Sequence, residues 1–158
     1  METSTFTIEL AQQADYCFEA RFDNPALPVL ITDEPPPMGA DNGPNPARLL
    51  GAAVANCLAA SLLFALRKFR IDMEPLRAIA TVAVRRNAQN RLRIGRIGVD
   101  LHLARPGSQS EQLRRVLDQF EDFCIVTQSV RAGIPIDVRV IDHNGAVLKQ
   151  PETTGEPA

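Results

Sequence analysis

The feature that most constrains the fold is a run of eighteen uncharged residues from Leu49 to Leu66. It follows Asn45-Pro46, where asparagine is a favoured helix cap and proline fits the first helical position. Three basic residues that suit the negative end of a helix dipole come directly after it, namely Arg67, Lys68 and Arg70. We therefore predict a long helix that begins at Pro46 and is apolar on every face.

A helix that is apolar on every face is expected to be buried on every face. The run also reaches the lower limit of length for a membrane span, so a transmembrane helix is an alternative interpretation. Against it, the run is rich in alanine, only weakly hydrophobic and flanked by strand-like segments. We favour a buried central helix and expect no contact with a membrane.

Burial of this helix has a consequence for assembly, because a small domain rarely encloses a helix by itself. The many small residues of the run would let helices or sheets of another subunit approach closely. We predict a homodimer with the helix at or near the interface. A monomer in which one sheet wraps the helix is the alternative.

The composition is that of an ordinary soluble domain, with 45% hydrophobic and 23% charged residues in 158. It excludes a disordered protein, a collagen-like repeat and a disulfide-dense scaffold. The net charge of −2 argues against a dedicated nucleic-acid binder. The first residues lack the basic and apolar regions of a signal peptide, so we expect a cytoplasmic protein. We predict a single domain over residues 1–149 and a disordered tail over 150–158.

Before the helix, apolar residues alternate with polar ones over residues 6–10 and 16–22. This pattern predicts two half-buried strands joined by a turn near Gln12–Asp15. A third, short strand is predicted at Val29–Ile31. Residues 32–46 are rich in proline and glycine and predict a long loop, which in a small domain is often functional.

After the helix, residues 76–84 and 92–103 predict a strand pair joined by a turn at Asn87–Asn90. The alternation changes parity between Gly95 and Gly98, which indicates a β-bulge.

A second helix is predicted to begin at a capping box formed by Ser108 and Glu111, and its spacing places Cys124 on the inward face. A last strand over 134–140 and a short return over 146–148 complete the chain. The predicted fold is α+β, with antiparallel sheets packed on the central helix.

The three cysteines, Cys17, Cys57 and Cys124, carry the most reactive chemistry in the sequence. In the cytoplasm, cysteines that pair are more often catalytic or redox-sensing than structural. Free cysteine also packs as a small hydrophobe, so the spacing alone leaves a functional pair and a purely structural role both open.

Other kinds of site find less support. His102 and His143 are isolated and no Cys-x-x-Cys occurs, so we expect no metal site and no histidine-dependent hydrolase. No glycine-rich phosphate motif occurs, so we expect no nucleotide or other cofactor. The basic segment Arg85–Arg96 has no interleaved aromatic residues, and we interpret it as a solvated hairpin, not a nucleic-acid site.

The stretch Asp33–Leu63 resembles the OsmC/Ohr family of osmotically inducible and organic hydroperoxide resistance proteins. The motif Gly43-Pro44-Asn45-Pro46 matches the helix start of that family, and Cys57 matches its first cysteine. Cys124, in Phe-Cys-Ile-Val, matches the second cysteine, where family members often have Cys-Pro-Val. The resemblance spans residues 6–147.

This resemblance implies an intertwined homodimer with two active sites at the interface, and thiol-dependent reduction of organic hydroperoxides in oxidative-stress defence. Cys57 would be the peroxidatic thiol, which becomes a sulfenic acid. Cys124 would be the resolving thiol, which forms a disulfide with it. An external dithiol, such as a lipoylated protein, would reduce that disulfide.

The mechanism requires a cation beside Cys57, because an ordinary thiol, with a pKa of about 8.5, is mostly protonated at neutral pH. The dipole of the helix does not help, since Cys57 lies about three turns from its start. In the peroxidase members of the family, the cation beside the thiol is an arginine from the N-terminal region. A glutamate directly after Asn-Pro holds that arginine in place. We predict Arg21 for this role, with Arg48 as the alternative.

That glutamate is absent here, where the position is Ala47. Its absence leaves open a second hypothesis: a binding or redox-sensing protein with little peroxidase activity, which holds a small apolar ligand at the dimer interface. Cys17 matches no family motif and is predicted to be incidental.

Overall fold

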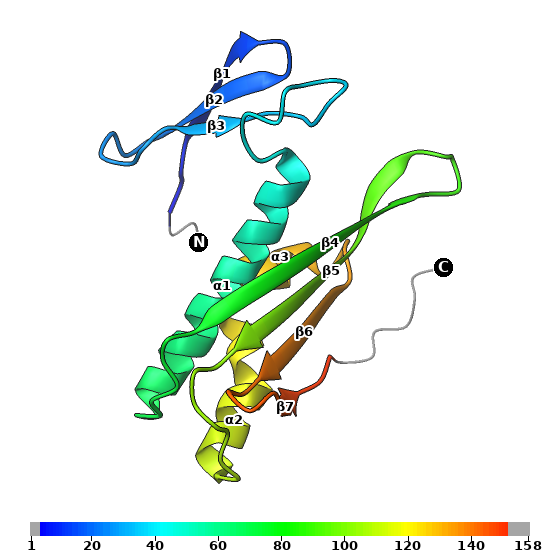
Figure 1. Ribbon diagram of the computed structural model, residues 1–158. Helices are drawn as coiled ribbons and strands as arrows, with labels where there is room; N and C mark the ends of the chain where they lie inside the picture. The colour runs from blue at the N-terminus through cyan, green and yellow to red at the C-terminus, as the bar shows by residue number, and fades with distance from the viewer. Residues whose placement is uncertain (1–3, 152–158) are drawn as a thin grey trace. The chain divides into compact units, whose positions relative to one another are not determined.

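The computed structural model describes residues 4–151, and in it the chain forms two compact units that divide between Leu49 and Leu50 (Figure 1). The predicted disordered tail falls largely on residues 152–158, which lie outside the described residues. The assignment of residues 1–149 to a single domain stays a prediction.

The first unit holds an antiparallel sheet in the order β1-β2-β3. Its strands are β1 (Ile8–Ala14), β2 (Cys17–Phe22) and β3 (Leu30–Thr32). All three strands were predicted, and the turn between the first two lies close to its predicted place, with Asp15 at a φ of 47°. Alternation and turn residues therefore suffice to locate this sheet.

The burial of β1 was predicted wrongly. Every residue of this strand is exposed, including Ile8 at 53% and Leu10 at 57%. In β2, by contrast, Ala20 is buried and its neighbours are mostly half-buried. Alternation identifies the apolar face of a strand, but it does not say whether another layer of the same chain covers that face.

The central helix α1 spans Pro46–Lys68. It begins where predicted, because Oδ1 of Asn45 accepts a hydrogen bond from the backbone N–H of Arg48 at 3.0 Å. One face is buried and the opposite face is exposed, with Phe64 at 68%. The buried residues are Gly51, Val54, Ala55, Leu58, Leu62 and Leu66.

Burial on every face is therefore not achieved within one chain. Among residues 4–151, α1 is the helix that is long and apolar enough to cross a membrane, and 33% of its apolar window is buried. The buried residues of α1, apart from Gly51, belong to the core of the second unit.

The second unit contains a four-stranded sheet in the order β4-β5-β6-β7. The strands are β4 (Arg77–Arg86), β5 (Leu92–His102), β6 (Ile136–Ile141) and β7 (Val147–Lys149). Strands β5 and β6 are parallel, so this sheet is mixed and not antiparallel throughout. A parallel pair needs a long crossover, which the helical segment between β5 and β6 supplies.

The predicted bulge lies in β5. Ala83 pairs with Arg96 and the next residue, Val84, pairs with Ile94, so Gly95 is the additional residue. A Cβ atom at Gly95 would lie 2.5 Å from Nε of Arg85, so a side chain at the bulge would have to displace the flexible side chain of Arg85.

The predicted second helix is divided into three parts: α2 (Glu111–Gln119), the 3₁₀ turn η1 (Phe120–Phe123) and α3 (Ile125–Val130). Two details of the prediction are wrong. The cap of α2 is Ser110, whose Oγ accepts from the N–H of Leu113 at 3.2 Å, and not Ser108. Cys124 lies in the break between η1 and α3, with extended backbone angles, and not within a helix. The apolar spacing continues through the break because Phe120 before it and Thr127 after it are both buried, although the adjacent Phe123 and Ile125 are exposed.

That core lies between one face of the β4–β7 sheet and the helices packed against it (Figure 1). Strand β5 contributes Ile97, Val99 and Leu101, and Phe120 is fully buried at the end of α2. Cys124 is a member of this buried cluster and Cys57 packs against it.

Candidate functional site

The packing of the second unit brings two thiols into one core. Cys57 comes from the middle of α1 and is half-buried. Cys124 comes from the break before α3 and is fully buried. Both are free thiols. The two cysteines stand on different elements, 67 positions apart in the chain, and meet only through the tertiary fold.

The surroundings of Cys124 favour its neutral form. Burial raises the pKa of the Cys124 thiol, and a hydrogen bond with Cys57 raises it further. The buried Thr127 acts in the opposite direction: its Oγ1 lies 3.0 Å from Sγ of Cys124 and its hydrogen bonds lower the pKa. Burial and Cys57 outweigh Thr127, so Cys124 is a protonated, solvent-shielded thiol at neutral pH. Cys57 is the more accessible of the two.

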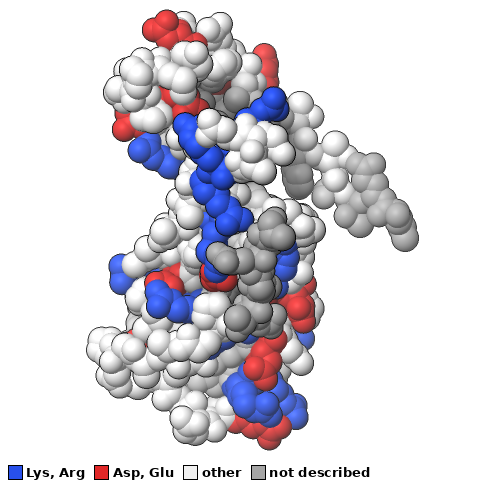
Figure 2. Space-filling view, turned by 90° about the vertical axis from the view of Figure 1, so that its right-hand side faces the viewer, with Lys and Arg blue, Asp and Glu red and all other residues white. Residues whose placement is uncertain are grey.

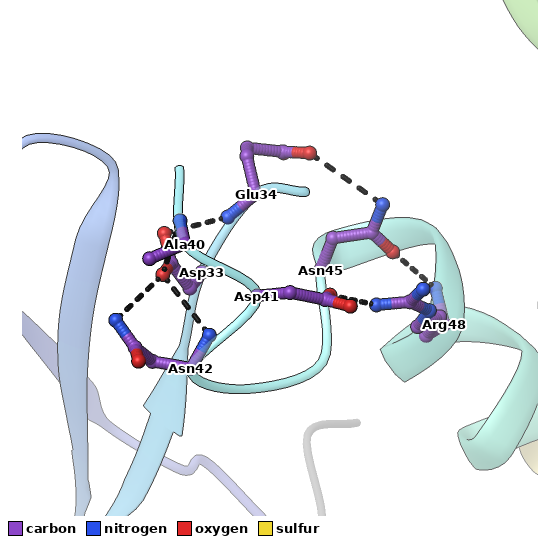
Figure 3. A network of polar contacts seen from close by, with 7 residues as sticks. All are labelled: Asp33, Glu34, Ala40, Asp41, Asn42, Asn45 and Arg48. Atoms are coloured by element: carbon purple, nitrogen blue, oxygen red, sulfur yellow. Dashed lines mark hydrogen bonds and ion pairs between the residues drawn. The ribbon is translucent and has the colours of Figure 1, made fainter. Parts of the chain in front are cut away.

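In the first unit, the proline-rich loop before α1 is ordered around Asp33 (Figure 3). This buried carboxylate accepts hydrogen bonds from the backbone N–H groups of Glu34 at 2.8 Å, Ala40 at 3.0 Å and Asn42 at 3.1 Å. The amide side chain of Asn42 adds a fourth at 3.0 Å. The backbone N–H of Asn42 contributes most to holding the pKa of Asp33 below its ordinary value.

Sequence analysis missed Asp33, although a signal was present. Aspartate readily accepts hydrogen bonds from backbone N–H groups in turns, and here it is followed by three prolines and then by Gly39. A Cβ atom at Gly39 would lie 2.3 Å from Oδ1 of Asp33 and 2.2 Å from the carbonyl oxygen of Glu34. Glycine is therefore required where the loop closes on this carboxylate.

The end of the loop is tied to the start of α1 (Figure 3). Nδ2 of Asn45 donates to Oε2 of Glu34 at 3.5 Å, and Arg48 pairs with Asp41. The start of the helix is therefore linked to the loop by a hydrogen bond to a carboxylate and by an ion pair.

Both arginines considered as partners of Cys57 belong to the first unit, and each has a carboxylate beside it. Arg21 pairs with Glu19 on the same face of β2, and Arg48 pairs with Asp41. Ala47 is half-buried in the first turn of α1, and Cys17 is half-buried at the start of β2.

The basic segment forms the tip of the β4–β5 hairpin. Four arginines there, Arg85, Arg86, Arg91 and Arg93, are exposed and form no ion pair within residues 4–151. Figure 2 shows a band of Lys and Arg side chains on this side of the molecule. Arg86 and Arg93 instead donate to carbonyl groups of their own hairpin. The interpretation of the segment Arg85–Arg96 as a solvated hairpin stays a prediction.

Neither histidine joins a cluster of ligands. In the described part of the chain, no group of three His, Cys, Asp or Glu residues is arranged to hold a metal ion. His102 is half-buried on β5, and its Nε2 atom is buried without a hydrogen-bond partner.

Comparison with known families gives one match: the model for the OsmC-like protein family matches residues 39–139. This range contains the end of the loop, the whole of α1 and both cysteines of the second unit. No curated protein matches the sequence.

Solved structures show the same fold. An OsmC-like protein from Mycoplasma pneumoniae has a TM-score of 0.75 and 17% identity, with 89% of this chain and 99% of that chain covered. An organic hydroperoxide resistance protein from Elizabethkingia anophelis has a TM-score of 0.68 and 18% identity, with 88% and 98% covered. The organic hydroperoxide resistance protein OsmC from Legionella pneumophila has a TM-score of 0.65 and 16% identity, with 89% and 98% covered. At these identities, the likeness establishes the fold.

Proposed function

Because the chain belongs to the OsmC-like protein family, we propose that it reduces organic hydroperoxides with the thiols of Cys57 and Cys124. Structural relatives that carry the name of organic hydroperoxide resistance proteins support the substrate class. The observation that carries the proposal is that Cys57, from α1, packs against the buried cluster that contains Cys124. After burial, the thiol of Cys57 is the next cause of the raised pKa of Cys124. Two incidental cysteines on different elements need not meet in one core.

The two thiols differ in a way that favours one order of events. Cys57 is half-buried and Cys124 is fully buried with a raised pKa. The thiolate is the attacking form of cysteine, so the accessible Cys57 is the proposed peroxidatic residue. Its sulfur attacks one peroxide oxygen and the O–O bond breaks. The products are an alcohol and a sulfenic acid on Cys57.

Oxidation of Cys57 then prepares Cys124 for the second step. Burial is the largest cause of the raised pKa of Cys124 and the charge of Cys57 is the smallest, and a neutral sulfenic acid on Cys57 removes that smallest contribution. The Cys124 thiolate therefore becomes easier to form after Cys57 is oxidised, with Thr127 beside it as a hydrogen-bond partner. A disulfide and water result, and an external dithiol returns both cysteines to thiols.

Arg21 is the proposed cation that favours the thiolate of Cys57. Arg21 pairs with Glu19, so a carboxylate holds this arginine although Ala47 provides none. Arg48 is the alternative, and its partner is Asp41.

The proposal also includes a homodimer in the cytoplasm. Its support is the apolar surface that one chain leaves open, on β1 at Ile8 and Leu10 and on α1 at Phe64. A second copy of the chain would cover such surface. Light scattering of the purified protein should give twice the mass of one chain, and Phe64→Glu should shift the mass towards the monomer.

Turnover of an organic hydroperoxide with an excess of dithiol tests the proposed activity. The natural sequence should turn over and Cys57→Ser should be inactive. Cys124→Ser should turn over more slowly than the natural sequence, because the Cys57 sulfenic acid must then react directly with the external dithiol. Full activity in Cys57→Ser would contradict the proposal.

A second function is favoured by Ala47 and by a small cavity in the first unit. This cavity has a volume of about 210 Å³, below the range of about 300–1,000 Å³ that is common for ligand pockets. It is lined by Leu10, Tyr16, Phe18, Thr32, Asp33, Glu34 and Pro46. Such a site suits a small apolar group, and the protein would then bind a ligand or sense redox state with little turnover. A large gain of peroxidase rate in Ala47→Glu would favour this function.

A further inference from the structure

A buried carboxylate lies three residues before Cys124. Glu121, in the turn η1, is only 8% exposed. Its carboxylate forms two ion pairs. One oxygen lies 2.5 Å from Nη2 of Arg131, and the other lies 3.2 Å from Nζ of Lys149. Both cations are themselves substantially shielded from water, and Nζ of Lys149 also lies 5.9 Å from the centre of the Phe120 ring.

The backbone of the same residue holds the start of α3. The carbonyl oxygen of Glu121 accepts the backbone N–H of Cys124 at 3.0 Å and Nε2 of Gln128 at 3.0 Å. Arg131 is the residue that caps the end of α3, and Lys149 is the last residue of β7. Glu121 therefore joins the residue with the thiol, both ends of α3 and the edge of the sheet.

The chain is irregular at the point that this network surrounds. Cys124 adopts φ −82° and ψ 96° between two helical segments, so no continuous helix fixes its position. Burial of three charges costs desolvation free energy, and an apolar cluster often stabilises a fold equally well. The network is thus better explained by the geometry that it imposes than by the stability that it adds.

We propose that Glu121, through Arg131 and Lys149, is a positioning residue that holds the Cys124 thiol where it can attack oxidised Cys57. This inference rests on the proposed function. In the step concerned, Sγ of Cys124 attacks Sγ of the Cys57 sulfenic acid and an S–S bond forms. The S–O bond of Cys57 breaks, and the leaving hydroxide takes the proton of the Cys124 thiol and departs as water.

The test separates this step from the one before it. Glu121→Gln keeps the shape of the side chain and removes the charge that binds both cations. Arg131→Gln, at the more exposed cation, is a milder second variant in case Glu121→Gln folds poorly. Glu111→Gln is the matched control, because Glu111 forms an ion pair with Arg115 on the exposed surface of α2.

Two rates are measured in each variant after a pulse of organic hydroperoxide: loss of the Cys57 thiol, and formation of the Cys57–Cys124 disulfide. Dimedone traps the sulfenic acid between them. Displacement of reacting groups by about 1 Å can slow a step by about a hundredfold. We expect disulfide formation to slow by about tenfold or more in Glu121→Gln and Arg131→Gln, with sulfenic acid accumulating. The rate of Cys57 oxidation, and both rates in Glu111→Gln, should stay close to those of the natural sequence.

Diamide provides an arm that does not depend on hydroperoxide, because it oxidises two neighbouring thiols directly to a disulfide. Slower diamide oxidation in Glu121→Gln and Arg131→Gln would support the positioning role. A natural protein that does not react with hydroperoxides would overturn the proposed function, but it would leave this result for the positioning role standing. Equal disulfide rates in all variants, or equal slowing of both steps with hydroperoxide, would overturn the positioning role.

Discussion

The two units of the chain are stabilised in different ways. In the first unit, Ala20 and Thr32 are among the few buried residues, and the long loop is ordered by hydrogen bonds to Asp33. In the second, apolar side chains of α1, β5, α2 and β6 form a core that contains Cys124. The comparison teaches that apolar packing places the proposed redox chemistry, whereas polar contacts shape the loop that precedes α1.

The largest expected effect separates the cysteines of the two units. Cys57→Ser should abolish turnover of organic hydroperoxide, because Cys57 is the proposed attacking thiol and packs against the core that contains Cys124. Cys17→Ser, at a half-buried position on β2, should leave turnover unchanged. A coupled assay with a dithiol reductant measures the turnover. An equal reduction of turnover by the two substitutions would contradict the different roles given to Cys57 and Cys17.

A second prediction concerns the core of the second unit. Leu62→Ala removes a fully buried side chain from α1 and should lower the free energy of unfolding by about 2–5 kcal/mol. Lys68→Ala, at the exposed end of the same helix, should change it by less than about 0.5 kcal/mol. Urea denaturation gives both values, and similar values for the two variants would contradict the described core.

A third prediction connects the first unit with the chemistry of the second. Arg21→Gln should slow oxidation of Cys57 by about tenfold at neutral pH, because it removes the proposed cation beside the attacking thiolate. Arg48→Gln should leave the rate nearly unchanged, and Arg21→Lys should restore part of it. Alkylation of Cys57 by iodoacetamide at neutral pH should also slow in Arg21→Gln. Slower alkylation in Arg48→Gln, with Arg21→Gln unchanged, would assign the role to Arg48.

The smallest expected effect is a loss of loop order on acidification. It allows a comparison of two aspartates, one in each unit, whose carboxylates order a loop. Asp33 in the first unit and Asp142 in the second accept several backbone N–H groups, and each has a pKa below the ordinary value. A carboxylate with a lowered pKa in the folded state stabilises the fold above its unfolded pKa. That contribution is lost as the pH falls through the folded pKa.

Hydrogen exchange at the amides of Ala40 and Asn42 reports the first loop, and exchange at Gly107 and Ala146 reports the second. Protection at all four should fall below about pH 4. Asp33→Asn should remove protection only in the first loop. Protection that is independent of pH in the natural sequence would contradict the role of both carboxylates.

Features of the fold that depend on neighbouring residues could be predicted from the sequence. Asn45-Pro46 marks the start of α1 because a helix cap is a local interaction, and the parity change near Gly95 marks the bulge because alternation is local. Features that depend on distant segments were missed. The parallel pairing of β5 with β6, the exposure of β1 and the break at Cys124 follow from what packs against each segment.

The same distinction applies to the candidate site. Cys57 and Cys124 were identified by their residue type, their apolar spacing and a family resemblance, and the fold brings them into one core. Asp33 and Glu121 were not identified. The partners of Asp33 are local, so its role was within reach of the sequence. The role of Glu121 depends on a partner farther along the chain, Lys149. No local pattern distinguishes Glu121 from the other acidic residues of the sequence.

Peptide-mapping mass spectrometry after a stoichiometric pulse of an organic hydroperoxide tests the central claim most directly. The account predicts rapid formation of a disulfide between Cys57 and Cys124, its reversal by a dithiol, and a Cys17 that stays reduced. Cys57 and Cys124 that both remain thiols after the pulse would contradict it.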